Sequence, residues 1–172
     1  MRYVFRVDSS LWIGTGHVAR CLTLADRLRE LGHDCHFLCR KFPGNMADQI
    51  SIRGHVVTLI ASDFSERENA DGIPHSHWLP SGCMSDAKLC SEVLRGTKVD
   101  WLIVDHYALD YRWEISMRPF TSWIMAIDDL ADRRHECDVL LDQTLGRRSD
   151  SYATLVTENC RLMLGANYAL LS

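Results

Sequence analysis

The chain has 172 residues, a length typical of one domain with a single hydrophobic core. A net charge of −4 argues against nucleic acid as the main partner. No apolar run reaches the roughly 18–20 residues that cross a membrane, so we expect no membrane association. The seven cysteines are scattered and odd in number, which argues against a disulfide framework, and a strand begins too early for a signal peptide. We therefore expect a cytoplasmic protein.

The first thirty residues predict a strand, a glycine turn and a helix. Aromatic and β-branched residues fill most of positions 3–7, and Asp8 and two serines end that strand. Gly14, Thr15 and Gly16 predict a turn whose glycines allow the backbone to approach a ligand closely. From His17 the apolar spacing becomes helical. The expected apolar stripe consists of Val18, Cys21, Leu22, Ala25 and Leu28, and the opposite face of Arg20, Thr23, Arg27 and Glu30.

His17 is the first candidate for chemistry. It falls in the first turn of the helix, where free N–H groups and the positive end of the dipole gather, and this disfavours the imidazolium. A neutral imidazole near pH 7 can accept a proton. Asp8, across the loop, is placed either to oppose this tendency or to fix the ring tautomer. The alternative is a structural histidine that closes a glycine turn.

The rest of the chain continues the alternation of strands and helices. Strands are expected at 34–38, 55–60, 101–104, 123–127, 139–141 and 161–164. Helices are expected at 46–53, at 81–95, after Asp110 as the N-cap, and at 152–156. The expected apolar face of the helix at 81–95 consists of Met84, Ala87, Cys90 and Leu94. This order predicts an α/β fold, a Rossmann-like open parallel sheet with helices on both faces. Residues 61–80 show no period and predict a long loop. His75, His77 and Trp78 in this loop could face a ligand, but a position at the surface is the commoner outcome.

Aspartates follow four of the predicted strands. They are Asp8, Asp105, the pair Asp128 and Asp129, and Asp142. Ligands of open α/β sheets bind outside the carboxyl ends of the strands, so these side chains are expected on one rim with the Gly14–Gly16 turn, His17 and Tyr107. Asp is also a good turn and cap residue, and we expect that role for two or three of them.

Metal and dinucleotide sites are not indicated. His33, Cys35, His36 and Cys39 form the densest group of metal-ligand residues. Cys35 and Cys39 alternate as one face of a strand does, and no second cluster follows at zinc-site spacing, so we predict no metal. The full GxGxxG fingerprint of dinucleotide folds is missing, because Ala19 stands three positions after Gly16. No cofactor is expected.

Four ordered stretches carry a family resemblance: RVDSSLWIGTGHVARCLTLADRL, WLIVDHYALDYRWE, IDDLADRRHECDVLLDQT and LGANYALL. They resemble the UDP-sugar hydrolases of pseudaminic acid biosynthesis, which cleave UDP-2,4-diacetamido-2,4,6-trideoxy-β-L-altropyranose. The resemblance extends over nearly the whole chain. That family is similar to GT-B glycosyltransferases, with two Rossmann-like domains and the active site in the cleft between them. Residues 1–172 are thus expected to form the N-terminal domain.

The resemblance assigns roles to particular positions. His17 matches the catalytic base that activates water for attack at the anomeric carbon. Tyr107 matches a residue of the sugar site, and Gly14 to Gly16 match the loop that borders the cleft. Asp8, Asp105, Asp128 and Asp129 match motif positions, and all but Asp105 join our predicted substrate-binding set. The implied partner is a UDP-sugar, with no metal.

The resemblance also marks a departure at the end of the chain. The family continues with an arginine and a second, nucleotide-binding domain, whereas this chain stops at Ser172. Either an expressed fragment or a naturally shortened product is consistent with this, and an apolar patch near Tyr107 and Tyr168 is expected to favour weak self-association. Two other functions remain open: the acceptor half of a GT-B glycosyltransferase, and a non-catalytic sugar-binding module.

Overall fold

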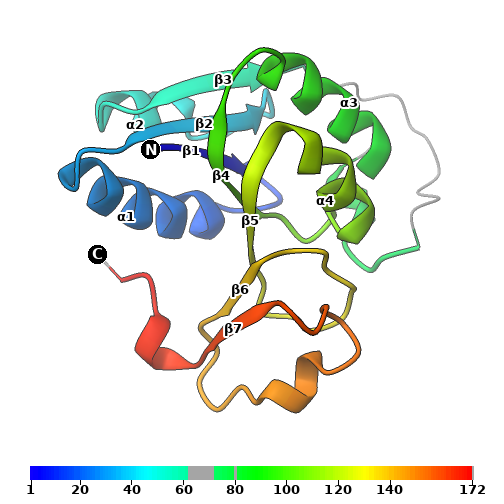
Figure 1. Ribbon diagram of the computed structural model, residues 1–172. Helices are drawn as coiled ribbons and strands as arrows, with labels where there is room; N and C mark the ends of the chain where they lie inside the picture. The colour runs from blue at the N-terminus through cyan, green and yellow to red at the C-terminus, as the bar shows by residue number, and fades with distance from the viewer. Residues whose placement is uncertain (62–71, 80, 172) are drawn as a thin grey trace.

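The computed structural model describes residues 1–61, 72–79 and 81–171. Within these residues the strands form one parallel sheet of seven, in the order β3-β2-β1-β4-β5-β6-β7 (Figure 1). The strands are β1 (Arg2–Val7), β2 (Asp34–Arg40), β3 (Val56–Ile60), β4 (Val99–Asp105), β5 (Thr121–Ile127), β6 (Val139–Asp142) and β7 (Arg161–Leu164). The predicted α/β class and open parallel sheet are confirmed.

Helices cover both faces of the sheet, as the alternation of elements predicts. α1 (Gly16–Glu30) and α2 (Ala47–Ile52) pack on one face, and α3 (Cys83–Leu94) and α4 (Tyr111–Met117) on the other (Figure 1). Short 3₁₀ turns complete the described chain: η1 (Ser76–Trp78), η2 (Arg118–Phe120), η3 (Ser149–Tyr152) and η4 (Ala166–Tyr168). No helix in the described ranges is long and apolar enough to cross a membrane.

The central strand β1 divides the core by its alternating side chains. Phe5 and Val7 point toward α1 and join one apolar cluster, with Phe5 stacked on Phe37 of β2 at 4.7 Å between ring centroids. Val4 points the other way, into the cluster under α3 and α4. Arg6 shares that second face although it is charged and fully buried. A charge in this position needs full compensation.

A buried ion cluster supplies that compensation. The Arg6 guanidinium donates to Asp8, at 2.7 and 2.8 Å, and to Asp86 of α3, at 2.7 and 3.0 Å. Asp86 also accepts from the Arg40 Nε at 2.9 Å and the Trp113 indole at 2.9 Å. Burial alone would raise the pKa of Asp86, but the two arginines outweigh it and hold the pKa below its usual value. The cluster therefore stays charged and joins β1, β2, α3 and α4.

This cluster explains one error of the sequence prediction. The buried stripe of α3 contains Cys83, Asp86, Ala87, Cys90 and Leu94. Met84, which we expected on that face, is 54% exposed. An apolar count cannot anticipate that a carboxylate takes an inner position, because its partners Arg6 and Arg40 lie far away in the sequence.

Three further expectations need correction or fall outside the description. The predicted helix at 152–156 is wrong, because the turn there is η3, which ends at Tyr152. The buried Tyr152 hydroxyl bonds to two strand-end aspartates. His77 is exposed as expected, whereas His75 and Trp78 are half-buried. Pro80 and residues 62–71 of the predicted loop lie outside the described residues.

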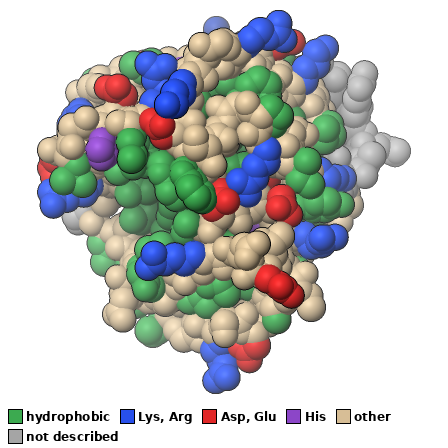
Figure 2. All heavy atoms as spheres, viewed as in Figure 1, with side chains coloured by type: hydrophobic (Ala, Val, Ile, Leu, Met, Phe, Trp, Pro, Cys, Tyr) green, Lys and Arg blue, Asp and Glu red, His purple; other side chains and the backbone are tan. Residues whose placement is uncertain are grey.

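An apolar groove of about 550 Å³ lies between α1 and the strands β4 to β7. Its lining includes Trp101, Met125, Met163 and Tyr168, and Figure 2 shows apolar side chains gathered on this side of the molecule. We expected one patch near Tyr107 and Tyr168. The structure separates them, because Tyr107 lines a different cavity beside His17.

We predict that Asp86→Asn destabilises the protein by about 3–5 kcal/mol, because it leaves two buried guanidinium groups without their shared carboxylate. The matched control is Glu30→Gln, which breaks an exposed pair with Arg27 and should cost about 0–1 kcal/mol. Urea unfolding at pH 7 measures both. Since the folded pKa of Asp86 is depressed, its contribution is complete above the unfolded value of about 3.9 and is lost as pH falls through the lower folded pKa. An Asp86→Asn protein as stable as wild type at pH 7 would contradict this account.

Candidate active site

The candidate site lies where the strand order reverses. β1 pairs with β4 in the middle of the sheet, and the connections that leave their carboxyl ends diverge there to opposite faces. Such a position forms the ligand crevice of open α/β sheets. The loop after β1 leads to His17 in the first turn of α1, and the loop after β4 carries Tyr107. The two rings meet edge to face at 4.7 Å between centroids.

His17 is oriented by the last residue of β4. The His17 Nδ1 lies 2.7 Å from the Asp105 Oδ1, a separation that requires a proton between them. A carboxylate only accepts, so we assign the proton to Nδ1, which leaves the lone pair on Nε2. One nitrogen of Arg20 lies at the longer distance of 3.3 Å from the same Nδ1. The Asp105 carboxylate is buried, which alone would raise its pKa, but hydrogen bonds from Arg20 and His17 outweigh burial and lower the pKa. We expected Asp8 to influence the ring; its partner is Asp105 instead.

Arg20 connects the two halves of the site. Its guanidinium binds Asp105 through two nitrogens, each at 2.6 Å, and binds Asp129 through the third at 2.8 Å. We placed Arg20 on the polar face of α1, one turn from His17, with no role in the site. The helical periodicity correctly places Arg20 outside the apolar stripe of α1. No sequence signal shows that its side chain turns toward the carboxyl ends of the strands and not toward solvent.

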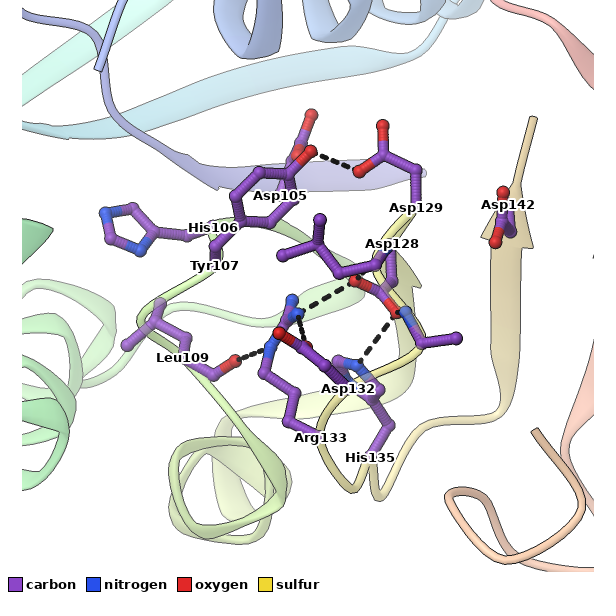
Figure 3. A network of polar contacts seen from close by, with 12 residues as sticks. Asp105, His106, Tyr107, Leu109, Asp128, Asp129, Asp132, Arg133, His135 and Asp142 are labelled. Carbon is purple, nitrogen blue, oxygen red and sulfur yellow. Dashed lines mark hydrogen bonds and ion pairs between the residues drawn. The ribbon is translucent and has the colours of Figure 1, made fainter. Parts of the chain in front are cut away.

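Asp129 and Tyr107 form the second half of the site. The Tyr107 hydroxyl donates to the Asp129 carboxylate (Figure 3). Burial and this hydrogen bond raise the pKa of Tyr107, so the phenol keeps its proton throughout the neutral range. His17, Asp105, Arg20, Asp129 and Tyr107 are thereby joined in one continuous polar chain. Of the predicted aspartates, Asp129 is the one that reaches the cavity.

An aromatic group closes one side of the site. Trp78 of η1 stacks on Tyr107 at 5.2 Å and meets the edge of His17 at 5.6 Å. His75 lies 5.2 Å from the Tyr107 ring. Arg133 is 4% exposed and lies over the Tyr107 ring at 5.5 Å. The loop around residue 78 lacks any hydrophobic period, so no local pattern indicated the contact between Trp78 and Tyr107.

Asp8 and Asp128 occupy supporting positions, in contrast to the substrate-facing positions that we predicted. Asp8 is 1% exposed and accepts from Arg6 and from the Arg40 backbone N–H at 2.6 Å. Asp128 is fully buried and is bound by Arg133 at 2.8 Å (Figure 3). The Tyr152 hydroxyl and backbone N–H groups also donate to it. Both carboxylates stabilise loops beneath the rim. Neither lines the cavity that contains His17.

The cavity beside His17 has a volume of about 330 Å³ and is open to solvent on one side. It is lined by Ile13, Gly16, His17, Arg20, Tyr107, Asp129 and Gln143. A base, a phenol and a carboxylate therefore face one small polar space. Gln143 follows β6 and is a lining residue that the sequence analysis did not select.

The glycine turn shapes the entrance to this cavity. Gly14 has a φ of +83°, a conformation that favours glycine, and its N–H donates to the Ser10 carbonyl at 2.9 Å. Thr15 is exposed at the N-cap of α1 and makes no side-chain cap bond. Gly16 begins the helix, and a Cβ built there meets nothing within 4 Å. The backbone thus leaves open space next to His17.

The metal-ligand residues do not gather around the site. Among the residues that the structure describes, no group of three His, Cys, Asp or Glu side chains is arranged to hold a metal ion. In the segment 33–39, Cys35 and Cys39 are buried under α1 and α2, whereas the His36 Nε2 lies 2.8 Å from the Thr58 hydroxyl. The strand alternation that we inferred for the two cysteines is confirmed.

Comparison with known proteins gives a distant sequence relative and several structural neighbours. No protein-family model matches the chain. Over 99% of its length the chain is 28% identical to UDP-2,4-diacetamido-2,4,6-trideoxy-beta-L-altropyranose hydrolase from Campylobacter jejuni. It spans 52% of that relative, so it is a distant homologue of about half of that protein.

The solved structures show the fold. MurG from Acinetobacter baumannii superimposes with a TM-score of 0.56 at 14% identity, covering 85% of this chain and 42% of that one. The calicheamicin glycosyltransferase CalG4 superimposes with a TM-score of 0.49 at 20% identity, and the match covers 86% of this chain and 32% of that one. The likeness to MurG shows that the sheet is Rossmann-like and corresponds to one half of a GT-B glycosyltransferase.

The two glycines should respond differently to alanine. Gly14→Ala forces a side chain into the left-handed region and should cost about 1–2 kcal/mol. Gly16→Ala adds a methyl group in open space at the first position of a helix and should be neutral or stabilising by up to about 1 kcal/mol. Urea unfolding of the two variants measures the difference. Equal stabilities would show that the turn is wrongly described.

Proposed function

We propose that this chain is the base-bearing half of a UDP-sugar hydrolase, and that its substrate is a UDP-linked diacetamido-trideoxy-hexose. The distant relative from Campylobacter jejuni supports the substrate class, because the match extends over nearly every residue of the chain. The Rossmann-like half of a GT-B fold supports a cleft between two domains. The gathering of a histidine, a phenol and a carboxylate around one cavity supports catalysis rather than binding alone.

The observation that carries the proposal is the His17 and Asp105 pair. Asp105 holds Nδ1 at 2.7 Å, and His17 lines the cavity, so Nε2 is the ring nitrogen left to act on a reactant. A general base needs a fixed tautomer and a free lone pair within reach of the proton it removes. This pair supplies both, from elements 88 residues apart.

The proposed step is a single displacement. A water molecule gives a proton to the His17 Nε2 as its oxygen attacks the anomeric carbon. The bond between that carbon and the UDP oxygen breaks, and UDP leaves with the electron pair. Asp105 stabilises the imidazolium that forms. UDP is a good leaving group when its charge is stabilised, so this half needs an oriented base and a sugar pocket, and no metal.

Arg20 keeps the pair in a working electrostatic state. An uncompensated buried carboxylate would favour the imidazolium, which cannot act as a base. Arg20 compensates the charge of Asp105 with two short hydrogen bonds, so the carboxylate interacts with the guanidinium as well as with the His17 ring. Through Asp129 the same guanidinium fixes the Tyr107 hydroxyl, which we propose contacts the sugar. Gly14, Thr15 and Gly16 border the same cavity and are proposed to lie along the substrate.

The other half of the active site is proposed to lie in a second, nucleotide-binding domain. The chain spans about half the length of its curated relative. The cavity beside His17, at about 330 Å³, lies at the lower end of the roughly 300–1,000 Å³ that is common for small-molecule sites, and it is open to solvent on one side. The sugar end fits this side of the cleft, and the diphosphate is left to the partner domain.

We expect His17→Asn to lower turnover of the two-domain protein by about 10²–10⁴-fold, the usual worth of a positioned base. Asp105→Asn should lower it by on the order of 10²-fold, because the ring loses its orienting partner. Release of UDP from the UDP-sugar is the measured quantity, with the Michaelis constant little changed in either variant. Arg27→Gln on the exposed face of α1 is the matched control and should leave turnover unchanged.

The same assay separates the competing functions. Release of UDP in water alone supports the hydrolase, and release that requires a sugar acceptor shows a glycosyltransferase. Sugar binding without release shows a non-catalytic module. A chelator is added in a parallel reaction, and activity that is lost and then restored by Mg²⁺ would overturn the metal-free step. Wild-type turnover by a folded His17→Asn protein would show that His17 is not the general base.

The 172-residue chain by itself is expected to fold but not to turn over. Its sheet and two apolar clusters are sufficient for one core. Displacement of reacting groups by about 1 Å can lower the rate on the order of 10²-fold. Loss of the proposed domain that binds the diphosphate should lower the rate further. UDP release and calorimetric titration with UDP are the measurements. Multiple turnovers, or micromolar UDP binding by this chain alone, would contradict the two-domain proposal.

A further inference from the structure

Two cysteines lie next to each other at the far edge of the sheet. Cys137 precedes β6 and Cys160 precedes β7, and their Sγ atoms are 3.7 Å apart. Cys137 is 2% exposed, and Cys160 is half-buried. Neither residue touches the cavity beside His17. The pair therefore lies outside the proposed hydrolase site.

The sheet fixes this separation. Val139 pairs with Arg161 in the parallel ladder between β6 and β7, and the Arg161 N–H donates to the Asp138 carbonyl at 2.9 Å. The Asp138 N–H donates in turn to the Ile124 carbonyl of β5 at 2.9 Å. Each cysteine is thus covalently joined to a residue that is anchored in the ladder. A disulfide has its sulfurs about 2.0 Å apart, so closure needs an approach of roughly 1.7 Å, which side-chain rotation and small shifts supply.

Cys160 differs from the other cysteines in accessibility and acidity. Cys21, Cys35, Cys39, Cys83, Cys90 and Cys137 are all buried. Burial raises the pKa of the Cys35 thiol to about 11 and those of Cys21, Cys39 and Cys90 further. The pKa of Cys160 lies below its usual value, because its sulfur shares a hydrogen bond with the Cys137 sulfur. The thiolate is the reactive form, so this pair has an attacking sulfur at the surface and a second thiol behind it.

We propose that Cys137 and Cys160 form a redox modification site that reacts with small disulfides of the glutathione class. The Cys160 thiolate attacks one sulfur of oxidised glutathione, forms a mixed disulfide and releases one glutathione thiolate. Cys137 then gives up its proton, its sulfur attacks the Cys160 sulfur, and the second glutathione leaves. The protein loses two protons and two electrons, and one oxidised glutathione takes them up to become two reduced molecules.

The crosslink would close a loop that supports the rim. The two cysteines are 23 positions apart, and the segment between them contains β6, Arg147 and Tyr152. Arg147 binds Asp142 and the Asp129 carbonyl, and Tyr152 bonds to Asp128 and Asp142. Closure of such a loop restricts the unfolded chain, so the oxidised protein should unfold at a higher temperature than the reduced one.

The experiment treats the reduced chain with excess oxidised glutathione at pH 8 without denaturant, followed by alkylation and intact mass measurement. We expect a loss of about 2 Da before alkylation, five alkylated cysteines of the seven, and a tryptic crosslink between the peptides of Cys137 and Cys160. Dithiothreitol should restore the original mass and the original midpoint of thermal unfolding. The same treatment of a denatured sample reports random pairing for comparison.

Two variants define the order of the steps. Cys137→Ser should stop at one stable glutathione adduct on Cys160, with a gain of about 305 Da. Cys160→Ser should remain unmodified, and circular dichroism verifies that both variants fold. A stable adduct on the wild-type chain, a crosslink between any other pair, or no reaction of the native protein would each overturn the proposal.

Discussion

The pairing of β1 with β4 is the constraint on which the site depends. Val7 lies opposite Asp105 in this parallel ladder, so the loops that follow the two strands leave the sheet at the same level. The direction of Asp105 depends on the same register. A slip of one residue would turn its side chain to the opposite face and away from His17. The alternation of β1 prevents such a slip, because it would turn Phe5 and Val7 out of the cluster under α1 and would turn the Arg6 charge away from Asp86.

Arginines from other elements hold the acidic rim in place. Arg20 of α1 binds Asp105 and Asp129, while Arg133 binds Asp128 and Arg147 binds Asp142. Each carboxylate is thus held in a fixed direction by an arginine. The consequence is a site with little freedom to rearrange, in which the positions of His17 and Tyr107 follow from a network rather than from single contacts. Such rigidity is what a base that must meet a small reacting atom requires.

The framework was predictable from the sequence because it depends on local patterns. Buried runs such as 101–104, the Asp110 cap and the glycine turn are encoded within a few residues, and the structure has each of them. The site was predicted only in part. A strand-end aspartate looks the same whether it faces a ligand or a loop, so Asp129 and Asp128 could not be distinguished. The contacts of Arg20 with Asp129 and of Trp78 with Tyr107 were not predicted, because each joins segments that are far apart in the chain.

The buried cluster of Arg6, Asp8, Arg40 and Asp86 has a consequence for how the protein changes over generations. The four charged side chains pair chiefly with one another, with added hydrogen bonds from Trp113 and from the Arg40 backbone N–H, and loss of any one leaves an imbalance of charge in the core. Single substitutions at these positions are therefore expected to be strongly destabilising, although an all-apolar replacement of the set need not be unstable. Among descendants of a common ancestor we expect the four positions to be retained together or exchanged together.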